Sequence, residues 1–222
     1  MTTNGPFPSL HRVDLYASGQ IILSAVTAEA PSISLDGIQF STNDTQWIDL
    51  PLGPDWNDEP SNWGWQRPQY RVFQSRVDLR GLVNRVTSGV SSGDLIAKLP
   101  LAPAGDVSFP TIAQQSNFSH RVDIRSDGAL LVHTTGADTR YVSLDGITFW
   151  NSSLGWQPLD LADNFASGPV QWARPQYLIV NDRIYLRGLL AKATGFCAND
   201  DLAATLPTGL SFCLCVSPEK EG

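Results

Sequence analysis

The sequence predicts an all-β protein made of two tandem antiparallel β-sandwich domains, jelly-roll-like and related by an internal duplication. Three observations predict this class. Short sequence motifs recur about 108 residues apart. Within these repeated phrases apolar residues alternate with polar ones. Pro or Gly occurs at intervals of roughly 8 to 12 residues, as expected of turns between short strands. Helical periodicity does not extend beyond about two turns. With 222 residues, 42% of them hydrophobic, the chain is long enough to bury a sizeable core.

The duplication is visible as matched phrases at a nearly constant spacing. The first phrases are shifted by 109 residues and the later ones by 107: His-Arg-Val-Asp at 11 and 120, Ser-Leu-Asp-Gly-Ile at 34 and 143, Trp at 47 and 156, Arg-Pro-Gln-Tyr at 67 and 174, and Leu-Arg-Gly-Leu at 79 and 186. The change of two residues falls in a stretch rich in Pro, Asn and Gly, where a loop tolerates insertion cheaply. We therefore predict two sequential domains, residues 1–112 and residues 113–222.

The strands are predicted by alternation within the repeated phrases. In residues 76–83, Val77, Leu79 and Val83 alternate with Asp78 and Arg80, and residues 183–190 repeat this pattern. A period of two predicts a strand with one buried face and one face in water. Gly81 and its copy Gly188 interrupt the apolar positions, which indicates a bulge or a close approach of the backbone.

The turns follow from Asp, Gly and Pro. An Asp-Gly pair lies between Leu and Ile in residues 35–38 and 144–147, as a tight type I′ hairpin requires. Pro68 and Pro175 have no N–H to donate, so each predicts the start or the edge of a strand. The repeated residues of this motif are expected to serve the structure: Arg67, Tyr70 and Arg80, with their copies Arg174, Tyr177 and Arg187. Of these, Arg80 and Arg187 could clamp a loop carboxylate.

Charge and cysteine content exclude several classes of partner. The net charge is −7 and neither half of the chain has a basic patch, so we expect no nucleic acid partner. The sequence contains no apolar run of about 18 residues, so we expect no membrane insertion, and no signal peptide is recognised. Cys197, Cys213 and Cys215 are odd in number and have no repeated copies, which favours a reducing compartment and buried apolar roles over a disulfide or metal framework.

The residues with catalytic potential form no recognised pattern. The three histidines show no metal spacing, and no nucleophile elbow or phosphate loop is present. Asp58-Glu59 and Asp200-Asp201 are adjacent carboxylates, and we interpret them as solvated loop charge rather than an acid/base pair. We therefore expect no enzyme, no cofactor, no catalytic residue and no metal site.

Tryptophan supplies the better case for a binding site. Four of the seven are repeat-matched and predict core packing, whereas Trp56, Trp63 and Trp150 have no tryptophan counterpart. A ring in a polar loop can stack on a sugar, with amides such as Asn57 and Asn62 as hydrogen-bonding neighbours. Contact with another subunit or burial in the core is the competing interpretation of these residues.

The repeated phrases resemble the β-sandwich modules of bacteriophage tail, tail-fibre and related virion-surface proteins. The matching residues in the second copy are Trp156 to Leu159, Pro175 to Tyr177, Ile184 to Leu189, Leu206-Pro207, Arg121 to Gly128 and Ser143 to Phe149. The chain continues both Leu-Pro turns differently from the family's usual Gly-Tyr-Arg-Pro. In the order of the family motifs, residues 47–149 alone would make one complete unit. Residues 11–40 and 156–216 would then be complementary halves, joined within one chain or between neighbouring chains.

The resemblance implies a virion protein assembled in the host cytoplasm. The partners it implies are other virion proteins, copies of the chain in a homo-oligomer and a host cell-surface glycan. The favoured function is a tail- or fibre-associated protein that contributes to host attachment. The alternatives are a purely architectural capsid decoration (cement) protein or tail adaptor and, least favoured, a glycan-active enzyme.

Overall fold

The protein is built from β-strands, in agreement with the predicted class. The computed structural model describes residues 11–15, 21–25, 46–58, 61–62, 64–86, 89–112, 119–134, 140–151, 155–180, 183–194 and 202–206. Within these residues there are several antiparallel sheets and no α-helix. The chain divides into two compact units, Met1–Ser153 and Leu154–Gly222, which we call the first and second unit.

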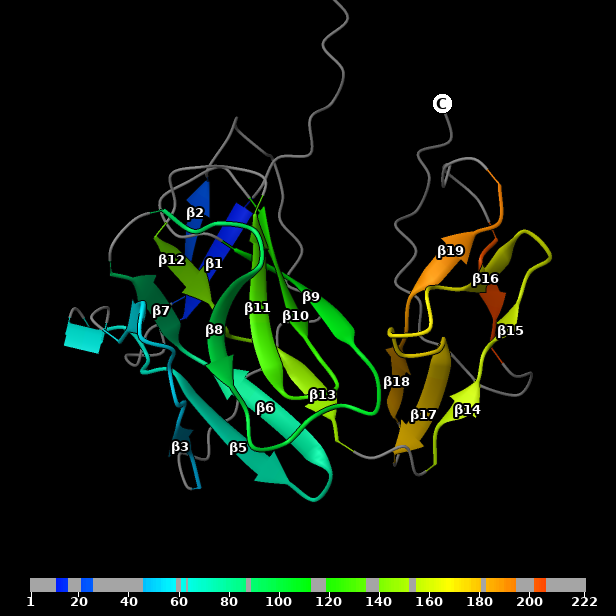
Figure 1. Cartoon of the computed structure of the whole chain (residues 1–222), viewed down its shortest axis with the longest axis horizontal. Coiled ribbons are helices and arrows are strands. Elements are labelled where there is room, and N and C mark those ends of the chain that lie inside the picture. Colours follow the sequence, from blue (N-terminus) through cyan, green and yellow to red (C-terminus); the bar gives the residue numbers. More distant parts are fainter. Residues whose placement is uncertain are drawn as a thin grey trace, which may run out of the picture. The chain divides into compact units, whose positions relative to one another are not determined.

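The first unit contains thirteen of the strands (Figure 1). Their bounds are β1 His11–Leu15, β2 Ile21–Ala25, β3 Ile48–Asp49, β4 Trp56–Asn57, β5 Gln69–Phe73, β6 Arg76–Arg80, β7 Leu82–Arg85, β8 Asp94–Lys98, β9 Val107–Ile112, β10 Ser119–Ile124, β11 Ala129–Thr134, β12 Tyr141–Ser143 and β13 Thr148–Trp150. Strands β1 and β2 form a hairpin with each other.

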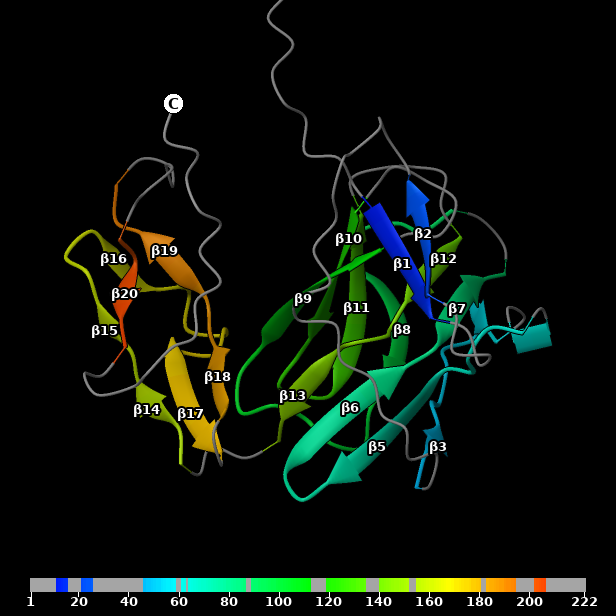
Figure 2. The ribbon, with the colours of Figure 1, turned by 180° about the vertical axis from the view of Figure 1, so that it is seen from behind.

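Three antiparallel sheets form the body of the first unit. Their strand orders are β8-β11-β10-β9, β12-β7-β4 and β13-β6-β5-β3. Figure 2 shows β5 and β6 as a long hairpin, and the side-by-side strands of the first of these sheets can be followed in both views. Strands β12 and β13, which come late in this unit, pair with β7 and β6, which come early. The sheets are therefore completed by strands from both ends of residues 46–151.

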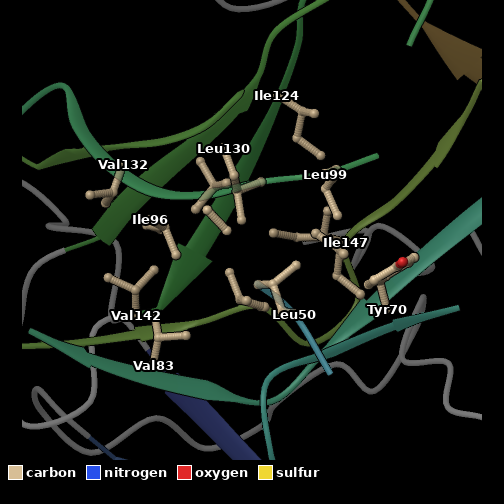
Figure 3. Close-up of a cluster of buried hydrophobic side chains, with 14 of the residues drawn as sticks. Leu50, Tyr70, Val83, Ile96, Leu99, Ile124, Leu130, Val132, Val142 and Ile147 are labelled. Atoms are coloured by element: carbon tan, nitrogen blue, oxygen red, sulfur yellow. The ribbon is translucent and has the colours of Figure 1, made fainter. Parts of the chain in front are cut away.

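The core of the first unit is one cluster of apolar side chains from all three sheets. Figure 3 shows Ile96 and Leu130 in the same cluster as Tyr70, Val83 and Val142. These residues come from β8, β11, β5, β7 and β12 respectively. Because the cluster draws on strands from early and late in residues 46–151, neither part of this stretch buries the core without the other.

The second unit repeats the pairing of the first unit's early strands. Its strands are β14 Gln157–Pro158, β15 Asp160–Leu161, β16 Phe165–Ser167, β17 Gln176–Val180, β18 Arg183–Arg187, β19 Leu190–Lys192 and β20 Ala204–Thr205. In the hairpin of β17 and β18, Tyr177 lies opposite Leu186, as Tyr70 lies opposite Leu79 in that of β5 and β6. Strands β14 and β16 likewise pair in the registers of their first-unit counterparts β3 and β4. The pairing of Leu161 with Ala204, in β15 and β20, corresponds to an isolated bridge between Leu52 and Ala97.

The division of the chain differs from the predicted boundary between residues 112 and 113. Strands β10 to β13 follow that boundary, yet β11 pairs with β8, β12 with β7 and β13 with β6. The structure thus assembles residues 46–151 into one unit, close to the alternative unit of residues 47–149. Two complete tandem sandwiches are not confirmed, because the described residues of the second unit contain counterparts of only the early strands.

The predicted exposure of one strand residue, Asp78, is corrected. Asp78 was expected on a wet face, but it is only 8% exposed, because it forms ion pairs with Arg71 and Arg76 and accepts a hydrogen bond from Thr148. A paired carboxylate is compatible with burial, which alternation alone does not reveal.

The Asp-Gly turn of residues 144–147 is not a hairpin. It connects β12 to β13, which belong to different sheets. Gly146 has a φ of 80° whereas Asp145 has no positive φ, and the N–H of Ile147 donates to the oxygen of Leu144, which is the type II arrangement. The copy of this turn at residues 34–38 lies outside the described residues.

The close backbone approach predicted at the repeated glycines is confirmed. Gly81 has a φ of 99°, and a Cβ there would lie 2.2 Å from the carbonyl oxygen of Arg67. Gly188 has a φ of 108°, and its Cβ would lie 2.3 Å from the oxygen of Arg174. Only glycine fits either position, because both the conformation and the space exclude a side chain.

Candidate functional site

Trp56, the first of the three unmatched tryptophans, belongs to the core. It lies on β4 opposite Arg85 of β7 and is 5% exposed. Its ring is therefore covered by the first unit's own side chains. A buried ring offers no face to a sugar, so this residue is corrected from a candidate binding residue to a packing residue.

The remaining residues of the predicted saccharide site are spread over the first unit. Trp150 is half-buried on β13, opposite Arg76. Asn57 lies on β4, in a different sheet, and accepts a hydrogen bond from Asn84 at 3.2 Å. Asn62 is exposed, and Trp63 lies outside the described residues. The structure does not bring Trp150 and Asn57 together on one sheet.

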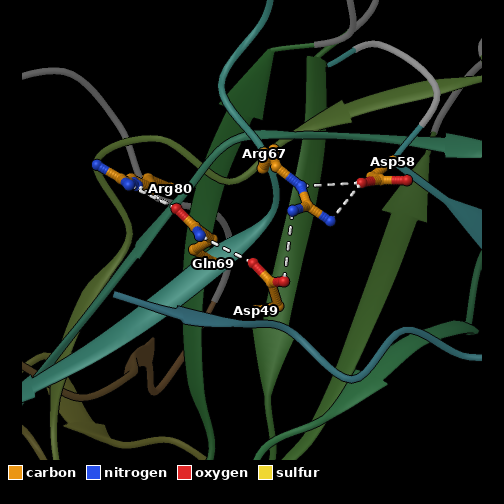
Figure 4. Close-up of polar contacts among 5 residues, drawn as sticks. All are labelled: Asp49, Asp58, Arg67, Gln69 and Arg80. Carbon is orange, nitrogen blue, oxygen red and sulfur yellow. Dashed lines mark hydrogen bonds and ion pairs between the residues drawn. The ribbon is translucent and has the colours of Figure 1, made fainter. Parts of the chain in front are cut away.

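The repeated Arg-Pro-Gln-Tyr motif builds a clamp of arginine, glutamine and tryptophan. The guanidinium of Arg80 lies 4.1 Å from the centre of the Trp47 ring, and its Nε donates to Oε1 of Gln69 at 2.9 Å. Nε2 of Gln69 in turn donates to Asp49 at 2.8 Å (Figure 4). A cation over an indole face, held by a planar amide, fixes β5 and β6 against the residue before β3.

Carboxylates of β3 and of the loop after β4 are bound by a different arginine from the predicted one. Arg67 pairs with Asp58 at 3.0 Å and with Asp49 at 3.5 Å, and Figure 4 shows it between the two. Both pairs are exposed to solvent, so each contributes little to stability. Arg80 was expected to clamp a carboxylate, but it binds the amide oxygen of Gln69 instead.

The second unit contains the same clamp. The guanidinium of Arg187 lies 4.2 Å from the centre of the Trp156 ring, and its Nε donates to Oε1 of Gln176 at 3.0 Å. Burial lowers the pKa of the Arg187 guanidinium from its ordinary value. Tyr177 is half-buried on β17, and the backbone of Arg174 faces Gly188. In both units the repeated residues therefore serve the architecture.

A hollow of about 510 Å³ on the sheet of β9, β10 and β11 was not predicted. Nδ1 of His133 lies 2.8 Å from the hydroxyl oxygen of Ser92, and its Nε2 lies 3.1 Å from Oδ2 of Asp123. Arg121 donates to the same carboxylate oxygen at 2.9 Å. His120 also lines the hollow, and burial lowers its pKa below the usual value near 6.5.

Part of this hollow could have been predicted from the sequence. Arg121 and Asp123 are two positions apart on one strand, so their side chains point to the same face. His133 lies opposite Arg121 in the register of β10 and β11. His133 was not linked to them because its partner strand and register are not visible in the sequence.

The residue types in the hollow resemble those of a nucleophilic triad, but the geometry favours binding. A serine nucleophile needs an imidazole oriented by a carboxylate. Here Asp123 is shared with Arg121, so its charge is already paired with a guanidinium. The side chain of Arg121 is 52% exposed, and its Nη2 donates to Asp123. Donors beside an imidazole suit a ligand that carries carboxylate or hydroxyl groups.

The residues that the structure describes contain no group of three or more His, Cys, Asp and Glu side chains that could hold a metal ion. The same residues include no helix with the length and apolar character needed to cross a membrane. Cys197, Cys213, Cys215 and the pair Asp200-Asp201 lie outside them.

The fold and the clamps define an all-β protein that builds one structural motif twice. No protein-family model matches the chain, and no curated protein matches it significantly. The duplicated clamps and the hollow beside β9, β10 and β11 are thus the observations that bear on function.

Proposed function

We propose that the chain is a non-enzymatic structural protein of a bacteriophage virion, associated with the tail or a fibre, that contributes to attachment to host-surface saccharide. One observation carries this proposal. The arginine, glutamine and tryptophan residues kept in both copies form the same internal clamp, at 4.1 Å in the first unit and 4.2 Å in the second. Duplication has thus preserved a scaffold, and its phrases resemble virion-surface modules.

The hollow beside β9, β10 and β11 is the part of the scaffold best suited to a saccharide. Arg121, whose side chain is half exposed, lines the hollow with Ser92, His133 and Thr134, and all four carry groups of the kind that hydrogen-bond to hydroxyls. Sugar recognition needs several directed polar groups within one concave surface. Trp150 on β13 remains the half-buried aromatic of the originally predicted set.

Two measurements test the proposal. Antibody labelling of phage particles that incorporate the tagged chain should place it on the tail or fibre. The purified full chain should bind a subset of sugars on a host glycan array, and Arg121→Ala should weaken that binding at least about tenfold, the equivalent of losing one charge-assisted hydrogen bond. Arg125→Ala, an exposed arginine on the neighbouring turn, is the matched control. The proposal is contradicted if the chain binds no host sugar and is not found on the particles.

A second candidate function, a capsid decoration protein or tail adaptor, is favoured by the burial of Trp56. One of the three rings on which sugar stacking was predicted packs in the core instead. For this candidate, labelling marks the capsid or the tail junction and the glycan array stays blank. Release of oligosaccharide from host envelopes by the full chain would favour the glycan-active enzyme instead.

A further inference from the structure

Three side chains from neighbouring strands form one row across a sheet of the first unit. Phe73 of β5 lies opposite Arg76 of β6, and Trp150 of β13 lies opposite the same arginine. Residues that are directly opposite in antiparallel strands have side chains on the same face of the sheet. Phe73, Arg76 and Trp150, which we call the aromatic row, therefore share one face.

The aromatic row lies on the face of this sheet that is turned away from the core. Val72 and Val77 precede or follow members of the row and pack in or against the core cluster, and successive side chains of a strand alternate between faces. Phe73 is 57% exposed, and Trp150 is half-buried. Figure 1 shows the turn between β5 and β6, beside which the row lies, at the lower edge of the first unit. Both aromatic side chains are therefore accessible from one surface.

A buried ion-pair network holds the middle of the row. Nε of Arg76 lies 2.9 Å from Oδ1 of Asp78, and Nη2 of Arg76 donates to Oδ2 of Asp78 at 3.0 Å. Nη2 of Arg71 lies 2.9 Å from the same Oδ2, and the hydroxyl of Thr148 donates to Oδ1 at 3.0 Å. A side chain that is fixed in this way loses little conformational freedom when a ligand binds.

The second unit repeats the arginine of the row but not its aromatic residues. Val180 of β17 lies opposite Arg183 of β18, in the same register as the first two members of the aromatic row. The sequence counterpart of Trp150 is Ser41. The hairpin of β17 and β18 forms with valine in place of phenylalanine, so the shared fold does not require an aromatic side chain there. The clamp, by contrast, is kept in both copies, which separates the row from the scaffold.

The spacing of the two aromatic side chains suits a chain of sugars. Phe73 and Trp150 project from strands that are two places apart in the sheet, a separation of about 9.5 Å. A pyranose ring is similar in width to one strand spacing, so a linear saccharide that crosses the strands places its first and third sugars over the two rings. The middle sugar then lies over Arg76, a side chain of the kind that hydrogen-bonds to hydroxyls.

The polar surroundings of the row favour a saccharide over a protein partner. Two positions further along each strand, the same face carries Arg71, Asp78 and Thr148, which lie opposite one another in register. The buried centre of a stable protein interface is depleted of charged residues. A saccharide instead presents apolar ring faces and hydroxyl groups together, and it needs aromatic side chains beside directed polar groups.

We propose that the aromatic row binds a linear saccharide of at least three sugars, at a site separate from the hollow beside β9, β10 and β11. This inference rests on the proposed function, attachment to host-surface saccharide, and adds the length of the sugar chain and the surface on which it lies. Phe73 and Trp150 stack on the outer sugars, and Arg76 orients the central one. The hollow belongs to another sheet, so the two sites can be tested separately.

Binding of oligosaccharides of defined length tests the proposal. The probes are chains of one to six sugars released from the surface polysaccharides of the host. The protein is the full chain with Arg121→Ala, which weakens binding in the hollow. We expect the affinity to increase about tenfold between two and three sugars, because the third sugar reaches the second aromatic ring. Phe73→Ala in the same background should remove this increase.

Ile48→Ala is the matched control. Ile48 is 51% exposed on β3 of the same sheet, and it lies opposite Tyr70, which belongs to the core cluster, so its side chain projects from the other face. This variant should keep the increase between two and three sugars. Trp150→Ala, with folding checked by circular dichroism, should remove it as Phe73→Ala does.

The outcomes separate this inference from the proposed function. A wild-type chain that binds none of the probes contradicts both. Binding whose dependence on length is unchanged by Phe73→Ala places the saccharide elsewhere and overturns the aromatic row alone. A change in the mass of the sugar-free protein with Phe73→Ala, measured by light scattering, assigns the row to subunit contact and also overturns the proposal.

Discussion

Asp145 and Gly81, which are 64 residues apart in the sequence, are joined by a hydrogen bond of 2.7 Å from the glycine N–H to the carboxylate. The contact ties the turn between β12 and β13 to the end of β6. Gly81 has a positive φ and lies just after β6, and its backbone N–H donates to the carboxylate of Asp145.

Replacing Asp145 with Ala should destabilise the first unit by about 1 to 3 kcal/mol, because the amide of Gly81 then lacks its acceptor. Urea unfolding followed by tryptophan fluorescence measures this. Asp145→Asn keeps an acceptor oxygen and should restore most of the loss. Equal losses for Ala and Asn would show that this hydrogen bond does not matter for stability.

Replacing Gly81 with Ala should cost more than the same change at Gly93. Both glycines have a positive φ, 99° and 93°, so each change costs about 1 to 2 kcal/mol for the backbone conformation. At Gly81 the new Cβ would also lie 2.2 Å from the oxygen of Arg67, whereas no atom lies within 4 Å of it at Gly93. We expect Gly81→Ala to cost on the order of 4 kcal/mol in urea unfolding. Similar values for the two variants would refute the close approach.

Trp56→Ala should destabilise the first unit by about 3 to 5 kcal/mol, as the loss of a buried aromatic ring does. Trp150→Ala should cost less, because its ring is only half-buried. Thermal unfolding of the two variants gives the comparison. A stable Trp56→Ala protein would restore Trp56 to the candidate binding residues.

The sequence predicts the local structure of the repeat well. The alternation around Leu79 and the positions of Pro68 and Gly81 fix the hairpin of β5 and β6 and the break after it, and the second copy folds in the same way. These features depend on neighbours in the sequence, through the period of a strand and the conformations open to Pro and Gly.

The pairing of distant strands is harder to predict. Alternation shows which residues share a face, but it does not show which sheet covers that face. For this reason Asp78 was expected in water and residues 144–147 were expected to form a hairpin, although they cross between sheets. The hollow around His133 needs the register of β10 and β11, which no local pattern supplies.

The clamp should depend on arginine rather than on positive charge. Arg80→Lys keeps the charge but removes the planar guanidinium that lies over Trp47 and donates to Gln69. We expect a loss of about 1 to 2 kcal/mol in urea unfolding and a change in tryptophan fluorescence. Arg125→Lys, on an exposed turn, should change neither. An unaltered stability for Arg80→Lys would mean that charge alone suffices.

His120 should make the stability of the first unit depend on pH. Burial disfavours the imidazolium, so the folded-state pKa lies below the unfolded value near 6.5. Between these two pKa values the unfolded chain binds more protons than the folded one, so the stability rises with pH. The stabilising contribution is fully present above pH 6.5 and is lost as the pH falls through the folded pKa. Unfolding midpoints in urea should therefore decrease from about pH 7.5 to about pH 5.5, above the range in which most carboxylates titrate. His120→Gln has no group that titrates there and should show a flatter profile, whereas a profile as steep as that of the wild-type chain would assign the dependence to another residue.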